Sequence, residues 1–249
     1  MCIITFGRYE LESIRYRTEL KYLINTKEFI TLRSGISAIF KRDSNSLAQG
    51  GYRIRSLYFD DVFNTDYFTK LSGTLDRKKY RVRFYNNDSS FIRMEKKVKK
   101  NLSSYKLSAP LTKEQTLRMV EGDFEFMKDS PYPLLREIYI YNSSRLLRPS
   151  VITDYYREAF VFEPMNVRIT FDEDLRTGLL SDDLFNPDAA LIPVTGKHQT
   201  ILEVKYDATL PDIAKQVLSC VDKTVMSISK FTACKRYMAL NSWEVEKWG

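Results

Sequence analysis

The sequence contains one histidine and three cysteines in 249 residues, and this scarcity excludes several kinds of site. A multi-histidine metal centre is impossible. A Ser–His triad would depend on His198 alone, which lies beside a Gly-Lys pair typical of a loop. Cys2, Cys220 and Cys234 show no paired spacing, so we expect reduced thiols and neither a disulfide framework nor a zinc site.

Long apolar runs are also missing. None approaches the roughly 18 residues that a helix needs to cross a bilayer. Residues 1–12 have a short apolar run followed by charges, unlike a secretory signal. Hydrophobic residues make up 43% of the chain and charged residues 29%, as in folded globular proteins. We therefore expect a soluble, cytoplasmic protein that forms one domain over residues 1–249, with a core at about 16–240.

Positive charge is what the sequence has in excess. Lys and Arg number 39 against 32 Asp and Glu, which gives a net charge of +7. Residues 51–100 hold 13 basic and 6 acidic side chains, and the rest of the chain is balanced. This concentration indicates an anionic partner.

Runs typical of strands alternate with runs typical of helices. Strands joined mostly by hairpin-like links predict an α+β domain built on an antiparallel sheet or barrel. The clearest hairpin covers residues 78–99, with a polar five-residue turn at 86–90. Thr112 and Gln115 have the spacing of a capping box, and Gly122 is placed to end that helix. We expect strands at 16–24, 53–59, 78–85, 91–99, 137–141, 150–157, 166–172, 190–194 and 200–206, and helices at 26–40, within 60–71, and at 112–121, 211–221 and 231–240.

Charged and apolar residues alternate along five of these strands. Successive strand residues point to opposite faces, so each strand has one charged face. For a single strand, a solvated sheet face explains the pattern. Over five strands the charged face carries twice as many bases as acids, and like charges on neighbouring strands repel. A face curled around a polyanion explains the excess, because arginine and lysine bind phosphate and a few carboxylates can hold a divalent cation. The bases are Lys21, Lys79, Arg81, Arg83, Lys97, Lys99, Arg168 and Lys205, and the acids are Glu19, Glu95, Asp172 and Glu203.

Two other classes of phosphate-binding protein do not fit. Tyr80 and Phe84 face away from the arginines of their strand, so they cannot stack bases over a basic groove, and we expect no nucleic acid partner. Residues 195–198 are not a P-loop, because Leu191 stands where the first glycine belongs and His198 where Ser or Thr belongs.

Eight segments occur in a characteristic order along the chain: RTELKY at 17–22, SLYFD at 56–60, KYRVRFY at 79–85, EKK at 95–97, YYR at 155–157, RITFD at 168–172, LEVKY at 202–206 and SKF at 229–231. Together they resemble VTC domains, the polyphosphate polymerase domains related to CYTH proteins and triphosphate tunnel metalloenzymes. The similarity runs from about Arg17 to Met238. It implies an antiparallel eight-stranded β tunnel with flanking helices and inward-pointing charges, in agreement with the alternation.

The resemblance implies transfer of the terminal phosphate of ATP onto inorganic polyphosphate or triphosphate, with Mn²⁺ or Mg²⁺. Such transfer needs positioning and charge neutralisation more than a protein nucleophile. Glu203 would hold the metal, with Glu19, Glu95 and Asp172 as further candidates. For Glu95 and Lys205, an ion pair within the wall is the alternative. The implied catalytic cations are Lys21, Arg81, Arg83, Lys97, Arg157 and Arg168, and the other phosphate-binding residues are Lys99, Lys106, Tyr155, Lys205 and Lys230.

Two departures from the family pattern keep other functions open. Arg17 replaces the first Glu of the Glu-x-Glu-x-Lys strand of hydrolytic tunnel enzymes, and Ser227 stands where eukaryotic polymerase domains have a lysine. The alternatives are a tripolyphosphate or nucleoside triphosphate hydrolase, and a polyphosphate-binding module without catalysis.

Overall fold

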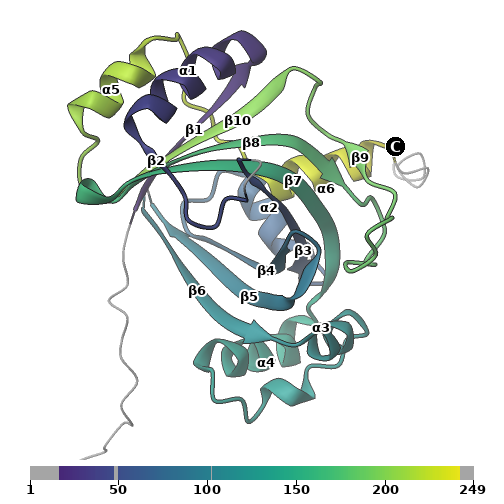
Figure 1. Ribbon diagram of the computed structural model, residues 1–249. Helices are drawn as coiled ribbons and strands as arrows, with labels where there is room; N and C mark the ends of the chain where they lie inside the picture. The colour runs from purple at the N-terminus through teal and green to yellow at the C-terminus, as the bar shows by residue number, and fades with distance from the viewer. Residues whose placement is uncertain (1–16, 48–49, 102, 242–249) are drawn as a thin grey trace, which may run out of the picture.

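The computed structural model describes residues 17–47, 50–101 and 103–241, and its centre is a strongly curled antiparallel sheet (Figure 1). The main strands are β1 (Thr18–Asn25), β3 (Tyr52–Asp60), β4 (Arg77–Tyr85), β5 (Asp88–Lys100), β6 (Ser103–Leu111), β7 (Arg148–Phe162), β8 (Val167–Thr177) and β10 (Gln199–Tyr206). They follow the order β1-β10-β8-β7-β3-β4-β5-β6. Two short strands, β2 (Lys41–Arg42) and β9 (Ile192–Pro193), pair with β7 and β8. The end strands meet at one bridge, where the Arg17 amide donates to the Ser104 carbonyl at 3.3 Å.

Helices flank this sheet, and the α+β prediction is confirmed. In Figure 1, α1 and α5 lie together on one outer face, and α3 and α4 lie at the far end of β5 and β6. None of the helices in the described ranges is long and apolar enough to cross a bilayer. Their bounds are α1 (Thr26–Ile39), α2 (Thr65–Leu71), α3 (Lys113–Val120), α4 (Pro133–Arg145), α5 (Asp212–Ser219) and α6 (Lys230–Asn241).

Hydrophobic side chains form clusters on both sides of the sheet. On the convex side, α1 and α5 cover a cluster that includes Phe171, and α3 and α4 cover another that includes Tyr80. On the concave side, α6 packs Phe231 against Tyr58 and Tyr155. Burial of each large apolar side chain stabilises the fold by roughly 1.5–3 kcal/mol. The apolar strand faces are therefore covered from outside, and the charged faces line the inside.

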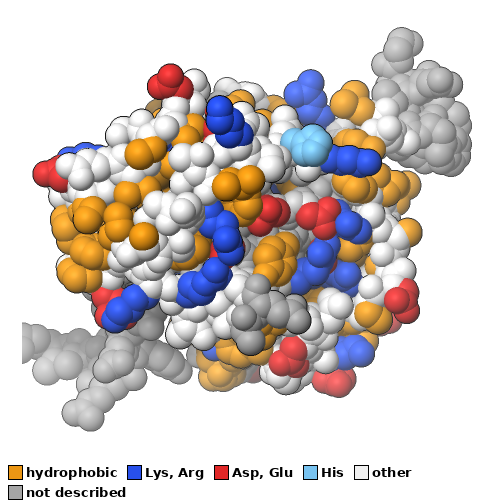
Figure 2. All heavy atoms as spheres, turned by 45° about the horizontal axis from the view of Figure 1, so that its top comes forward, with side chains coloured by type: hydrophobic (Ala, Val, Ile, Leu, Met, Phe, Trp, Pro, Cys, Tyr) orange, Lys and Arg blue, Asp and Glu red, His pale blue; other side chains and the backbone are white. Residues whose placement is uncertain are grey.

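The face of the molecule that Figure 2 shows is mixed in charge. On the face shown in Figure 2, basic and acidic side chains are interspersed, and hydrophobic side chains gather at the left. His198 is exposed in a turn, as expected, and its ring nitrogen lies 3.4 Å from the Thr26 hydroxyl. Cys220 is exposed and Cys234 is buried, both as free thiols, while Cys2 lies outside the described residues.

The predicted capping box of α3 is confirmed. The Thr112 hydroxyl accepts from the Gln115 amide at 3.1 Å, and the Gln115 side-chain oxygen accepts from the Thr112 amide at 3.0 Å. Thr112→Ala is expected to lower the free energy of unfolding by about 1 kcal/mol, because one helix-end amide loses its acceptor. Urea unfolding measures this loss. Thr112→Ser should behave like the wild type, and equal losses in both variants would contradict the capping role.

The strand predicted at 137–141 is wrong, because these residues lie inside α4. The sequence Glu-Ile-Tyr-Ile-Tyr alternates like a strand, which caused the error. Pro133 at the first turn is the helix signal, and the side chains of Leu134, Leu135 and Ile138 are buried on one helical face.

Two further features differ from the prediction. Strand β6 was missed, since Pro110 and several polar residues weaken its pattern, but it is an edge strand that pairs only with β5 along its length. The hairpin turn is shorter than predicted. Strand β5 begins at Asp88, and Asn86 and Asn87 have φ of 51° and 57°, which suits a two-residue turn of left-handed residues.

Candidate functional site

The concave side of the sheet encloses a cavity of about 200 Å³ with a strongly basic wall. Twelve of its 21 lining residues are Lys or Arg, and the only acids among them are Glu19 and Glu203. The basic residues are Lys21, Lys70, Arg77, Lys78, Lys79, Arg81, Arg83, Lys97, Lys99, Arg157, Lys205 and Lys230. The lining contains eleven of the fifteen residues predicted for the site, so the cavity is where the sequence-predicted groups meet. It also contains Lys70, Arg77, Lys78 and Lys79.

Strand register explains why these charges face inward together. Arg81 pairs with Glu95 and Lys79 pairs with Lys97 across β4 and β5, so their side chains share the concave face. Residues of opposite parity point outward. The Lys96 ammonium pairs with Glu137 of α4. Lys78 is among the lining residues, but its ammonium lies 3.4 Å from the centre of the Tyr141 ring.

Glu203 lies at the centre of the basic wall. Its carboxylate is 3.3 Å from the ammonium groups of Lys21 and Lys205 and 3.5 Å from the Arg157 guanidinium. Burial alone would raise its pKa, but Lys205 and Lys21 hold the pKa of Glu203 well below its usual range. The group is therefore an anion surrounded by cations.

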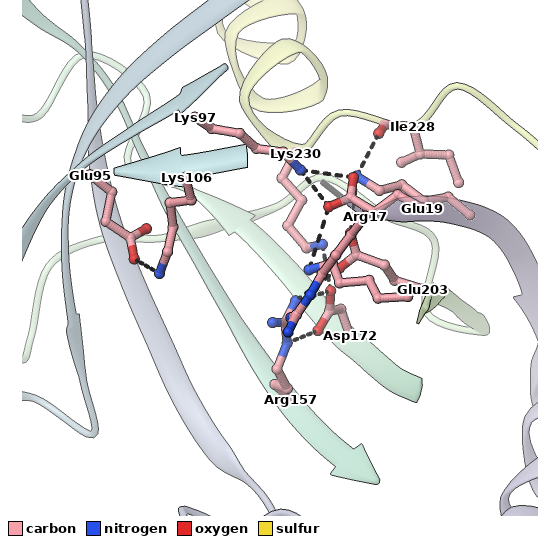
Figure 3. Close-up of polar contacts among 12 residues, drawn as sticks. Arg17, Glu19, Glu95, Lys97, Lys106, Arg157, Asp172, Glu203, Ile228 and Lys230 are labelled. Atoms are coloured by element: carbon pink, nitrogen blue, oxygen red, sulfur yellow. Dashed lines mark hydrogen bonds and ion pairs between the residues drawn. The ribbon is translucent and has the colours of Figure 1, made fainter. Parts of the chain in front are cut away.

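Glu19 is the second carboxylate of the cavity. Its oxygens accept from the Lys97 ammonium at 2.5 and 2.7 Å, and Lys21 and Lys205 lie within 3.6 Å (Figure 3). Burial and the nearby Glu203 raise its pKa, and the three lysines lower it more, to about 2. Lys21 and Lys205 thus bridge the two carboxylates.

Asp172 sits behind the cavity wall and positions two of its cations. The fully buried carboxylate accepts from the Arg157 guanidinium at 2.6 and 2.7 Å and lies 2.5 Å from the Lys230 ammonium (Figure 3). Burial raises its pKa, but Arg157 and Lys230 bring it down to about 2. This predicted metal candidate is engaged by the two cations and lies outside the cavity lining.

Glu95 forms a separate cluster. Its carboxylate is 2.7 Å from the Arg81 guanidinium and 2.6 Å from the Lys106 ammonium, with Arg83 at 4.0 Å. Figure 3 shows the Glu95–Lys106 pair apart from the group around Glu203. This arrangement corresponds to the wall ion pair that was the alternative for Glu95.

Two predicted phosphate-binding residues lie outside the cavity lining. The guanidinium of Arg168 pairs with Asp43 and donates to the Tyr52 hydroxyl at 2.9 Å. The side chain of Lys106 is half exposed beside Glu95. Their roles as phosphate ligands stay predictions.

Tyr155 contacts three basic side chains. Its hydroxyl accepts from Arg83 at 3.0 Å, and its ring centre is 4.7 Å from the Lys230 ammonium and 5.4 Å from the Arg157 guanidinium. Burial raises its pKa, but Arg157, Arg83 and Lys230 lower it below the ordinary value. The phenol can therefore both orient Arg83 and face an anion.

Several lining residues were not among the predicted site residues. Lys79 had the right parity, and its ammonium donates to the Ser229 hydroxyl at 2.7 Å. Strand alternation could not indicate Lys70, because this residue reaches the cavity from α2. Its ammonium donates to the hydroxyl of Ser227 at 2.6 Å, so a cation stands beside the position where eukaryotic polymerase domains have a lysine. Tyr58 also lines the cavity, and its hydroxyl accepts from Arg81 at 2.9 Å.

The donor set suits a metal shared with phosphate. Across the described ranges, no group of three or more His, Cys, Asp or Glu side chains is arranged to hold a metal ion. Mg²⁺ and similar hard cations are often held by one or two carboxylates, with phosphate oxygens and water completing the shell. Glu19 and Glu203, joined through Lys21 and Lys205 in one cavity, provide that number of carboxylates.

Comparison with known proteins gives one family match. The family model of the VTC domain matches residues 16–239, nearly the whole chain. A search of the curated proteins finds no match.

Three of the solved structures that this chain resembles come from two bacteria and an archaeon. A candidate adenylate cyclase from Bacillus halodurans is 12% identical, with a TM-score of 0.49 over 86% of this chain and 94% of that one. Another from Vibrio parahaemolyticus is 12% identical, with a TM-score of 0.46 over 88% and 98%. A protein from Pyrococcus horikoshii is 11% identical, with a TM-score of 0.40 over 82% and 85%.

Proposed function

Because the chain belongs to the VTC domain family, we propose that it is a polyphosphate polymerase that transfers the terminal phosphate of ATP onto a polyphosphate chain in its β cavity. The observation that carries the proposal is the cavity wall, with twelve basic residues and two carboxylates around about 200 Å³. Polyphosphate carries roughly one negative charge for each phosphate. Such an excess of cations matches the charge of a row of phosphates better than it matches the charge of one small anion.

The wall residues have distinct parts in the proposed reaction. Arg81, Arg83 and Arg157 offer bidentate donors that stabilise charge on the transferred phosphate, and Lys21 and Lys97 add point charge. A divalent cation, Mn²⁺ or Mg²⁺, would neutralise phosphate charge in the complex, held by Glu203 with Glu19. Because the acceptor is itself a phosphate, the reaction needs no nucleophilic side chain.

The test of this function is product analysis on a gel. Purified protein with ATP and Mn²⁺ is expected to form a polyphosphate ladder, with ADP as the co-product. Free phosphate without a ladder would contradict the proposal and favour a hydrolase of the tunnel type. Binding of polyphosphate without turnover of ATP would favour a binding module.

The protonation of Lys97 makes ligand binding depend on pH. Burial and the cations Lys21 and Lys205 lower its pKa to about 8, against the opposing effect of Glu19. Bound phosphate favours the charged form, so binding takes up a proton above pH 8. Tripolyphosphate affinity should then fall as the pH rises past about 8, by up to roughly tenfold per pH unit for one proton.

Calorimetry of wild type and Lys97→Arg measures this effect, because arginine stays charged. The ligand's own titration is common to both proteins and cancels in the comparison. The ratio of the Lys97→Arg affinity to the wild-type affinity should grow above pH 8. A ratio that stays constant would show that Lys97 does not titrate there.

A further inference from the structure

One part of the cavity wall consists of basic side chains without carboxylate partners. Lys70 comes from α2, Arg77 and Lys79 from the start of β4, and Lys99 from the end of β5. We call these four residues the carboxylate-free wall. Among the residues that the structure describes, no Asp or Glu oxygen lies within 4.0 Å of their charged nitrogens.

Their polar contacts are with neutral groups. The Lys70 ammonium donates to the Ser227 hydroxyl at 2.6 Å and to the carbonyl of that residue at 3.2 Å. The Lys79 ammonium donates to the Ser229 hydroxyl at 2.7 Å. Arg77 donates to the Thr74 carbonyl at 2.9 Å. These contacts orient the cations without neutralising them.

The other cavity cations are different. Apart from Lys78, whose ammonium lies against the Tyr141 ring, each of them contacts Glu19, Glu203, Glu95 or Asp172. The contacts of Lys21, Lys97, Arg157, Lys205 and Lys230 are examples. The cavity therefore has a region where cations and carboxylates are mixed, and a region where all the charge is positive.

The carboxylate-free wall is unfavourable without a ligand. Arg77 and Lys99 face each other in register across β4 and β5, where like charges repel. Burial lowers the pKa of Lys79, and Lys21, Lys97, Lys70 and Arg77 lower it further. Burial, Arg77 and Lys99 likewise lower the pKa of Lys70. An anion bound among these groups would relieve both the repulsion and the desolvation.

We propose that Lys70, Arg77, Lys79 and Lys99, with the Ser227 and Ser229 hydroxyls, form a subsite that holds the polyphosphate chain without a metal ion. The proposal rests on the proposed function. Near Glu19 and Glu203, a phosphate meets carboxylates and needs a divalent cation between them. At the carboxylate-free wall no such repulsion exists, so the chain binds through ammonium, guanidinium and hydroxyl donors alone.

Binding in the presence of EDTA tests the subsite independently of catalysis. Fluorescently end-labelled long-chain polyphosphate is titrated with wild type and with Lys70→Gln/Arg77→Gln. Both side chains are partly exposed and form no ion pair with any residue that the structure describes. The double variant should lose about tenfold or more in affinity, as expected for two charged hydrogen-bonding groups. Its affinity for tripolyphosphate with Mn²⁺, which binds beside Glu203, should stay within about twofold of the wild type.

A matched variant controls for net charge. Lys27→Ala/Lys128→Ala removes two exposed cations outside the cavity and should leave both affinities unchanged. The subsite is refuted if wild type does not bind long-chain polyphosphate in EDTA, if the cavity variant binds it as well as wild type, or if both double variants lose affinity equally. None of these results requires turnover, so a missing ladder from ATP would count against the polymerase and not against the subsite.

A second readout separates the subsite from a structural role. Lys79→Met removes a half-buried charge that contacts no carboxylate among the described residues, so the ligand-free variant should melt at a higher temperature than wild type. The same variant should gain less thermal stability on addition of polyphosphate in EDTA. A melting temperature of ligand-free Lys79→Met below that of wild type would show that Lys79 stabilises the fold and would contradict its role in the subsite.

Discussion

Glu203→Gln should reduce the rate of phosphate transfer from ATP by at least about a hundredfold, since a metal ion that neutralises phosphate charge is worth several kcal/mol in the transition state. The substitution keeps the size of the side chain and removes the charge that lies 3.3 Å from Lys21 and Lys205. Binding of long-chain polyphosphate in EDTA should persist or tighten, because the cavity becomes more positive. Initial rates at saturating ATP and Mn²⁺, together with that binding measurement, check both parts.

Glu95→Gln is the matched control. Both carboxylates are buried and contact cations of the cavity wall, but Glu95 lies outside the cavity lining, with Arg81 and Lys106. Glu95→Gln is expected to lower the stability of the fold. The dependence of its rate on Mn²⁺ concentration should stay close to that of the wild type. If Glu203→Gln keeps the wild-type metal dependence, Glu203 does not hold the metal.

Asp172→Asn should lower the free energy of unfolding by about 3 kcal/mol, because it leaves buried Arg157 and Lys230 with an uncharged partner. The carboxylate is fully buried and binds both groups at 2.5 to 2.7 Å. Transfer activity should fall as well, since the two cations lose the group that orients them. Urea unfolding at neutral pH measures the stability. The exposed pair Asp212–Lys215 provides a control, and Asp212→Asn should unfold like the wild type.

The contribution of Asp172 to the free energy of unfolding should also decrease as the pH falls. Its pKa is lowered to about 2 in the folded protein, below the value of about 3.9 that a free aspartate has. The stability difference between wild type and Asp172→Asn should be full above about pH 4 and should shrink as the pH falls towards 2. A difference that is independent of pH over this range would mean that the carboxylate charge does not stabilise the fold.

Much of the fold could be predicted because strands with one charged face leave a clear two-residue period. The hairpin of β4 and β5, the helix capped by Thr112 and the strand around Glu203 were all located from such local signals. Residues 137–141 were not, because their alternation fits a strand, whereas Pro133 at the first turn and the burial of Ile138 select the helix. The edge strand β6 has little periodicity of its own, and its pairing with β5 supplies the hydrogen bonds that define it.

The candidate site was predictable to the extent that strand parity defines it. Parity and the family motifs brought together Lys21, Arg81, Lys97 and Glu203, which share one cavity. The pairing of each charge depends on register between distant strands, so the burial of Asp172 behind Arg157 could not be read from the sequence. Lys70 illustrates the other limit. It lies on a helix, outside every charged strand, and enters the cavity only because α2 packs beside the segment that carries Ser227.

The most direct test of the account follows the terminal phosphate itself. Protein is incubated with unlabelled polyphosphate and ATP labelled at its γ-phosphate, with Mn²⁺, and the products are separated by size. The account predicts that the label enters the polymer with one ADP formed for each phosphate added, and that Glu203→Gln suppresses both. Label found in orthophosphate alone, with the polymer unlabelled, would contradict it.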